Sequence, residues 1–114
     1  MEIALAVASS LGTVEELFWV NYGLAKALSE QGKFEDAQTR VDHAKSHAVN
    51  DAYLLAYAMD LQARVWEEQH RFEEARSEAL RALDIFEKLG AAHNAEDTKE
   101  LLRYIDTRRA GQPR

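Results

Sequence analysis

The sequence predicts an all-α fold, a right-handed solenoid of helix hairpins with about six helices in 114 residues. The first observation behind this prediction is an internal repeat. Residues 31–37, Gln-Gly-Lys-Phe-Glu-Asp-Ala, recur 38 positions later as residues 69–75, Gln-His-Arg-Phe-Glu-Glu-Ala. A period between about 20 and 50 residues is typical of solenoids. The second observation is that the only proline is Pro113, so no proline interrupts a helix in the body of the chain.

The repeat extends well beyond this core segment. It runs from Leu24 aligned with Gln62 to Ala44 aligned with Ala82. Seven of the 21 aligned pairs are identical, namely Ala25/Ala63, Glu30/Glu68, Gln31/Gln69, Phe34/Phe72, Glu35/Glu73, Ala37/Ala75 and Ala44/Ala82. Because one helix hairpin cannot bury its apolar face alone, such units are expected to stack on one another.

Composition limits the classes of protein to consider. With 46% hydrophobic and 30% charged residues, the chain has the balance of a single globular domain rather than a disordered segment. The formal net charge of −6 argues against a nucleic-acid partner, which requires a basic face. The absence of cysteine excludes disulfides, thiolate metal ligands and a cysteine nucleophile.

No targeting or membrane segment is predicted. The apolar run over residues 3–8 is short, and it follows Glu2 instead of a basic residue, which argues against a signal peptide. No stretch approaches the roughly 18 apolar residues that span a membrane. We therefore expect a cytoplasmic protein.

The first two helices are expected over residues 2–11 and 13–31. The apolar positions of the first, over residues 2–11, are Ile3, Val7 and Leu11, and Gly12 offers a left-handed end. The second, over residues 13–31, begins with Thr13 and Glu16 spaced as a capping box and ends before Gly32. Its apolar stripe consists of Val14, Leu17, Phe18, Leu24, Ala25 and Leu28.

Four more helices are expected, over residues 34–48, 51–69, 72–89 and 94–109. Asp51 is the predicted cap of the second of these, Gly90 ends the third, and Asn94 opens the last. We expect Phe34 and Phe72 to be buried where paired helices meet, against Ala25 and Ala63. Residues 110–114 are expected to be a disordered tail.

The resulting single domain comprises a half-repeat over residues 1–12, repeats over 13–49 and 50–90, and a terminal helix over 91–109. The pattern resembles the tetratricopeptide repeat (TPR), written W-x2-L-G-x2-Y, then A-x3-F and P. In the first repeat the four leading positions are Asn21, Leu24, Ala25 and Leu28, and in the second they are Met59, Gln62, Ala63 and Trp66. Both repeats lack the closing proline, where Val49 and Glu87 stand. The period of 38 exceeds the usual 34 by about one helical turn, which points to a long-helix variant.

The segment from Ala82 to Gly90, followed by an acidic helix, resembles the C-terminal end of longer TPR arrays. Such arrays follow the nucleotide-binding modules of multidomain signalling NTPases. This resemblance implies that the chain is a piece of a larger signalling protein.

A second stripe of side chains, outside the apolar one, marks the candidate binding site. Its members are Trp19, Tyr22 and Lys26 on the helix over 13–31, and Tyr53, Tyr57, Asp60 and Arg64 on the helix over 51–69. In a TPR superhelix this face lines the concave groove, where aromatic and charged side chains bind partner peptides. The alternative is that Trp19 and Tyr57 only fill contacts between neighbouring helices. The lysine and asparagine cluster by which chaperone-binding TPRs hold carboxylates is absent, so chaperone tails are not the expected ligand.

Catalytic and metal-site motifs are weak. His43 and His47 have the spacing of a two-histidine metal site, but Ala44 stands where the zinc-protease pattern requires glutamate. Neither a phosphate-binding loop nor a nucleophile elbow is present. We therefore predict a non-enzymatic protein–protein interaction scaffold without metal or cofactor. The alternatives are a structural or oligomerisation segment without a ligand, or a metal-dependent hydrolase that uses His43 and His47.

Assembly is predicted from the first helix. Ile3, Val7 and Leu11 would face solvent on one side, and exposed apolar patches promote association. We expect a homodimer, formed by end-to-end stacking or by exchange of helices.

Overall fold

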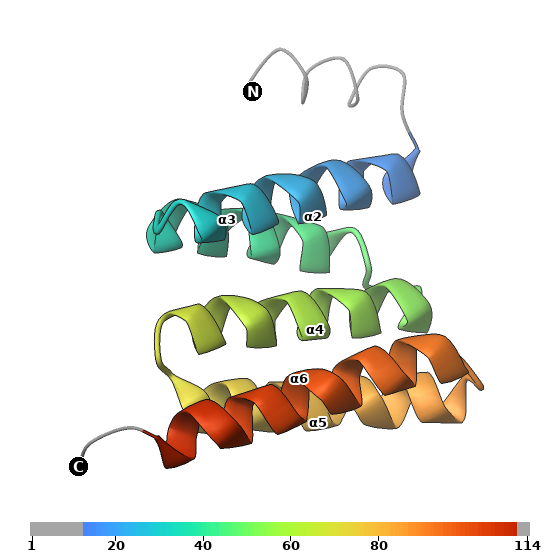
Figure 1. Cartoon of the computed structure of the whole chain (residues 1–114). Coiled ribbons are helices and arrows are strands. Elements are labelled where there is room, and N and C mark those ends of the chain that lie inside the picture. The colour runs from blue at the N-terminus through green and yellow to red at the C-terminus, as the bar shows by residue number, and fades with distance from the viewer. Residues whose placement is uncertain (1–12, 112–114) are drawn as a thin grey trace.

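The computed structural model describes residues 13–111, and within this range the chain is all-helical, without a strand. The helices are α2 (Val14–Glu30), α3 (Phe34–Ser46), α4 (Ala52–Glu68), α5 (Phe72–Lys88) and α6 (Ala92–Ala110) (Figure 1). The all-α prediction is confirmed, with five helices in the described range instead of six. The predicted helix over 2–11, the dimer surface assigned to it and most of the predicted tail lie outside the described residues.

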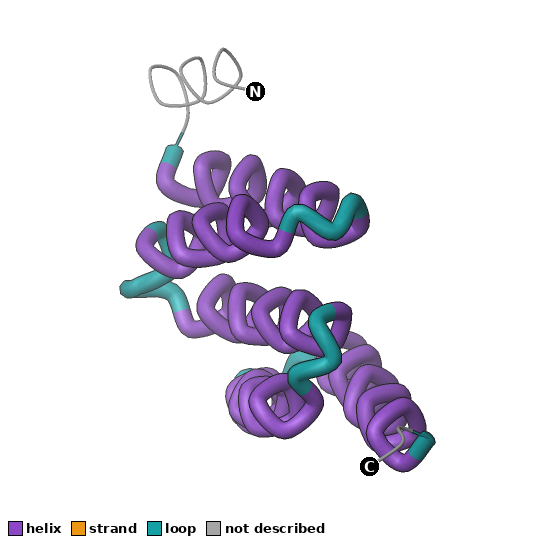
Figure 2. The backbone as a smooth tube through the Cα atoms, turned by 90° about the vertical axis from the view of Figure 1, so that its left-hand side faces the viewer, coloured by secondary structure: helices purple, strands orange, loops and turns teal. Residues whose placement is uncertain are grey.

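Consecutive helices pack against each other as antiparallel neighbours. The α2–α3 and α4–α5 hairpins are stacked, and α6 folds back along α5 (Figures 1 and 2). Contacts between α2 and α4 and between α4 and α6 also exist. In Figure 1, α3 and α5 lie behind α2 and α6, so α2, α4 and α6 share one side of the molecule.

The same three-residue turn makes three of the four connections. Its middle residue adopts a left-handed conformation, with φ of 78° at Gly32, 63° at His70 and 70° at Gly90. In each case the last amide of the turn donates to a carbonyl five residues earlier, as when Lys33 N donates to Leu28 O at 2.9 Å. This is the hydrogen-bond pattern of a Schellman cap. The predicted helix ends at Gly32 and Gly90 are confirmed.

Side-chain caps begin two of the helices, as predicted. The Thr13 hydroxyl accepts from Glu16 N at 3.1 Å, and the Asp51 carboxylate accepts from Leu54 N at 3.1 Å. The predicted start of the last helix at Asn94 is wrong, because the tight turn at Gly90 leads directly into a helix at Ala92.

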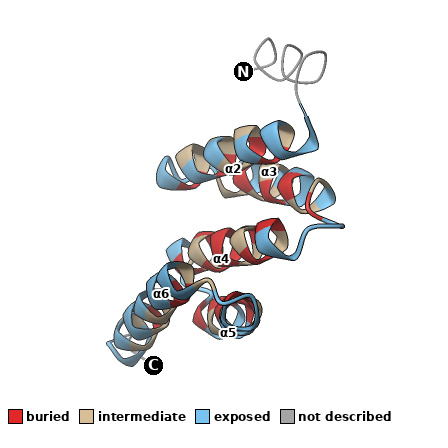
Figure 3. Ribbon diagram, turned by 90° about the vertical axis from the view of Figure 1, so that its right-hand side faces the viewer, coloured by how far each residue is buried: buried red, intermediate tan, exposed pale blue. Residues whose placement is uncertain are grey.

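The core lies between the helices, and the outward faces are exposed (Figure 3). Its largest fully buried apolar side chains are Phe18, Phe86, Leu61, Ile105, Val41 and Val65. Fully buried alanines, including Ala25, Ala37, Ala63 and Ala75, let the helices approach closely.

The two repeated phenylalanines are buried to different extents. Phe72 is 5% exposed, as predicted, because Leu101 and Ile105 of α6 cover it. Phe34 is only half-buried and packs at the edge of the cluster around Ala25 and Val41. The predicted equivalence of the two positions is therefore wrong, and the difference comes from α6.

Candidate functional site

A cleft of about 620 Å³ opens on the side formed by α2, α4 and α6. Its lining residues are Tyr22, Lys26, Tyr57, Asp60, Arg64, Phe86, His93, Asn94, Asp97, Thr98, Glu100, Leu101 and Tyr104. Five of the seven predicted site residues are therefore brought together here. The other two, Trp19 and Tyr53, are in ring contact with Tyr57.

Helical spacing places these side chains on one face. Tyr22 and Lys26 are one turn apart on α2, and Asp60 and Arg64 are one turn apart on α4. Lys26 and Arg64 occupy aligned positions of the repeat, 38 residues apart. The stacking of α2 on α4 consequently sets equivalent positions side by side.

The aromatic residues form a continuous set of edge-to-face contacts. The Trp19 ring lies 5.0 Å from Tyr57 and 5.3 Å from Tyr22, and Tyr57 lies 5.6 Å from Phe86. These centroid distances are in the favourable range for aromatic pairs. Trp19 is 37% exposed, so it joins α2 to α4 and still presents part of its ring to solvent.

Asp60 lies beneath the cleft surface and ties α4 to α6. It is 7% exposed and accepts from Arg64 Nε at 2.6 Å and from the buried Thr98 hydroxyl at 2.8 Å. Burial, and secondarily the Asp60 charge, raises the pKa of the Tyr22 phenol. Burial disfavours the charged Arg64, but the Asp60 charge and hydrogen bond outweigh it and raise the pKa of Arg64. Both side chains therefore keep their protons at neutral pH.

The α6 wall of the cleft was missed by sequence reasoning. Asn94 Nδ2 donates to the Tyr57 hydroxyl at 2.7 Å, and the Tyr53 hydroxyl donates to Asn94 Oδ1 at 3.1 Å. Asn94, Thr98 and Leu101 recur at helical spacing, which was the available signal.

A smaller hollow of about 170 Å³ adjoins the cleft. Its apolar lining comes from Leu61, Val65 and Leu101, and it shares Lys26 and Arg64 with the cleft. Ser29, which is 3% exposed, also lines this hollow, and its hydroxyl has no hydrogen-bond partner among residues 13–111. We refer to the cleft and the small hollow together as the groove.

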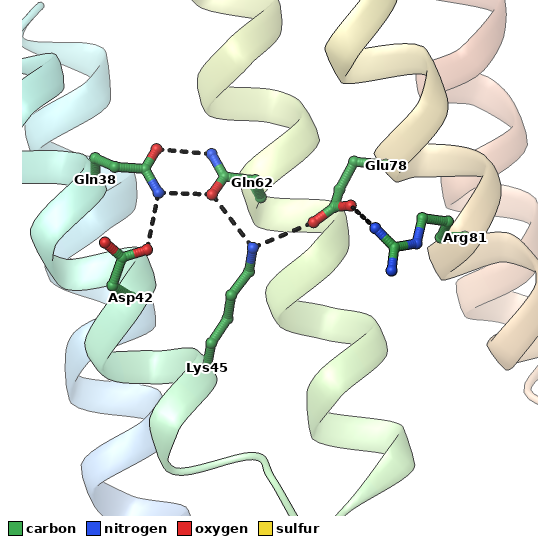
Figure 4. A network of polar contacts seen from close by, with 6 residues as sticks. All are labelled: Gln38, Asp42, Lys45, Gln62, Glu78 and Arg81. Carbon is green, nitrogen blue, oxygen red and sulfur yellow. Dashed lines mark hydrogen bonds and ion pairs between the residues drawn. The ribbon is translucent and has the colours of Figure 1, made fainter.

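A separate polar network joins α3, α4 and α5 (Figure 4). Gln38 and Gln62 donate to each other, at 2.6 Å and 2.8 Å, and Gln62 is 1% exposed. Lys45 Nζ donates to Gln62 Oε1 at 3.3 Å and to Glu78 Oε2 at 3.2 Å. Because its groups satisfy one another between packed helices, the network fixes how the hairpins stack.

The alternative metal site at His43 and His47 has no third ligand in the described part of the chain. His43 is exposed and His47 is half-buried, and no group of three or more histidine, aspartate or glutamate side chains among residues 13–111 could hold a metal ion. Of the helices described, none is long and apolar enough to cross a membrane.

The arrangement is thus a helical protein with an aromatic and charged groove along α2, α4 and α6. No family model matches the chain, and neither a curated protein nor a solved structure matches it.

Proposed function

We propose that this protein is a protein–protein interaction scaffold that binds a peptide or helix of a partner in the groove. The observation that carries the proposal is the cleft of about 620 Å³, lined by tyrosines and by charges of both signs. Concave sites with a few polar groups among aromatic side chains are typical of binding sites. Tyrosine offers rigid contact area at a low cost in conformational entropy.

The proposal also includes the way in which the helix hairpins are arranged. We propose a right-handed solenoid of the TPR type, in which α2–α3 and α4–α5 are two long-helix repeats and α6 is the terminal helix. The recurrent left-handed turn after α2 and α4 supports this architecture, as do the buried alanines at equivalent positions. The groove would then be the concave surface of the superhelix.

Within this proposal, the chain binds without catalysis, metal or cofactor. It acts as a segment of a larger cytoplasmic signalling protein and forms a homodimer. Tyr22 and Tyr57 supply flat contacts, whereas Lys26 and Arg64 orient the bound segment. Trp19 contributes its exposed edge, and Tyr53 holds Asn94 in place on α6.

A structural role without a ligand is the second candidate. The observation in its favour is that Asp60 satisfies Arg64 and Thr98 internally, while Trp19 packs on three neighbouring rings. Those side chains would stabilise the stack even if nothing bound in the groove.

The test is selection of binders from a displayed library of random dodecapeptides, followed by mapping of the binding site by nuclear magnetic resonance shifts. The expected shifts lie at Lys26, Arg64 and Tyr104, which all line the groove. Lys26→Ala should change the affinity of the selected peptides without unfolding the protein, because Lys26 is exposed and forms no ion pair within residues 13–111. The matched control is Lys33→Ala, an exposed lysine outside the groove. Failure to select any groove binder would favour the structural role.

A further inference from the structure

We propose that the occupant of the groove is a basic amphipathic segment of a partner protein. In this assignment, which rests on the proposed function, one apolar side chain enters the small hollow. Lysine or arginine side chains flank it and face the carboxylates at the two ends of the groove.

The groove is lined by more carboxylates than cationic side chains. Two of its carboxylates are already compensated, since Asp60 is paired with Arg64 and Glu67 is paired with Arg108. Four more remain along the walls, namely Asp97, Glu100, Glu30 and Glu68. Against them, Lys26 is the one lining lysine or arginine without an ion pair in the described part of the chain. The groove therefore carries a surplus of negative charge.

Within the described residues, these four carboxylates form only weak ion pairs or none. Asp97 lies 3.6 Å from His93 and Glu100 lies 4.0 Å from Arg103, in pairs that are exposed on both sides. Exposed pairs of this type contribute little to stability. Glu30 and Glu68 have no ion pair among residues 13–111. A partner that brings cations to these positions would not have to displace strong internal contacts.

The small hollow has the size and the apolar lining to hold one side chain. Its volume of about 170 Å³ suits one large apolar side chain, since an apolar cavity of about 150 Å³ can hold benzene. Leu61, Val65 and Leu101 provide the apolar contacts. The Ser29 hydroxyl beneath the hollow is buried and has no partner among residues 13–111.

Acidic and basic side chains alternate along the groove. Glu30 and Glu68 are the last residues of α2 and α4, one turn beyond Lys26 and Arg64, while Asp97 belongs to the part of the cleft that also contains Tyr57 and Asn94. Lys26 and Arg64 separate the two acidic ends and repel a cation placed between them. The complementary segment thus has cationic residues on both sides of its apolar anchor. The net charge of −6 also attracts such a partner.

The experiment uses the full chain and the library of random dodecapeptides. The expected binders contain lysine or arginine on both sides of a large apolar residue. Their affinity should fall as salt rises toward about 1 M, where the Debye length is only about 3 Å. Glu68→Lys should weaken the selected peptides on the order of tenfold, which corresponds to about 1.4 kcal/mol. Glu35→Lys, a reversal at an exposed glutamate of α3 outside the groove, should leave their affinity unchanged.

Glu68→Lys should not unfold the protein, because Glu68 is exposed. It lies at the C-terminal end of α4, where a lysine is favourable for the helix dipole. Glu68→Gln serves as a second variant and should produce a smaller loss. Groove binders that are acidic or neutral would overturn this inference and leave the proposed function standing. The absence of any groove binder would overturn both.

Discussion

The two repeated hairpins share a sequence pattern but differ in what supports them. In α2–α3, Phe34 is half-buried and the turn contains Gly32; in α4–α5, Phe72 is buried and the turn contains His70. The buried polar side chains of α2, Asn21 and Ser29, each have an oxygen without a partner in the described range. The buried polar side chains of α4, Asp60, Gln62 and Glu67, are all hydrogen-bonded.

Much of the difference comes from α6, which covers only the second hairpin, whereas Gln62 is hydrogen-bonded by Gln38 and Lys45 of α3. Thr98 bonds to Asp60, Arg108 pairs with Glu67, and Arg109 pairs with Glu73. The Arg108 guanidinium also lies 5.6 Å from the centre of the Phe72 ring. A hairpin with this sequence pattern can therefore contain buried acids, or leave its aromatic residue half-covered, depending on the helix that packs beside it.

The largest expected difference between the hairpins concerns the phenylalanines. Phe72→Ala should lower the free energy of unfolding by about 3–5 kcal/mol, because it removes a buried ring from a packed cluster. Phe34→Ala should cost clearly less, since Phe34 is already half-exposed. Urea denaturation of both variants measures the difference. Equal losses would show that α6 does not distinguish the two hairpins.

Breaking the link from α4 to α6 should have the next largest effect. Asp60→Ala removes the acceptor of Arg64 Nε and the shorter of the two hydrogen bonds of the buried Thr98 hydroxyl, and it should cost about 2–3 kcal/mol. Asp97→Ala is the matched control on the exposed surface, with an expected change within about 0.5 kcal/mol. Chemical denaturation of the two variants side by side provides the measurement. A loss at Asp60 no larger than at Asp97 would contradict the structural role of the buried carboxylate.

The turns should respond in opposite directions. Gly32→Ala should destabilise by about 1–2 kcal/mol, because an L-residue is strained at a φ of 78°. A Cβ at this position meets no atom within 4 Å, so the cost is conformational and not steric crowding by neighbours. His70→Gly relieves the same strain but removes the contacts of the ring with Arg108 and Phe72, so it should stabilise by less than about 1 kcal/mol. The melting temperatures should therefore move apart, and a shift of both in the same direction would refute this account.

The smallest expected effect concerns the buried hydroxyl of α2. Ser29→Ala should raise the free energy of unfolding by about 0.5–1 kcal/mol, since alanine favours the helix and the hydroxyl has no partner among residues 13–111. Ser77→Ala on the exposed face of α5 is the control for helix propensity alone. If the two substitutions stabilise equally, the unpaired hydroxyl carries no penalty.

Local signals in the sequence were sufficient to predict much of the fold. Thr13 and Asp51 were identified as caps from residue type and spacing, and Gly32 and Gly90 as left-handed ends, because these features act within one turn of helix. The start of α6 was missed since Asn94 resembles a cap, although the turn at Gly90 has already started the helix.

Long-range partners explain what the sequence could not predict in the groove. Tyr22, Lys26, Tyr57 and Arg64 line the cleft as helical spacing indicated. Asp60 was predicted as a groove residue, but its burial was not predicted, because its partner Thr98 lies 38 residues away. Gln62 aligns with Leu24 and resembles an apolar core position, yet Gln38 supplies its partner from another helix. A pairing of this kind is not visible in a local pattern.

The paired amides of Gln38 and Gln62 also bear on the order in which the chain folds. Most helix contacts join neighbours in sequence, and chains with such local contacts fold within microseconds to milliseconds. Each hairpin can begin to form on its own, but the amide pair closes only when α3 meets α4 in the correct register. A misaligned collapse would leave both amides buried without partners, at a cost of about 1–3 kcal/mol for each unsatisfied group. The pair thereby favours the correct register of α3 on α4 over misaligned packing.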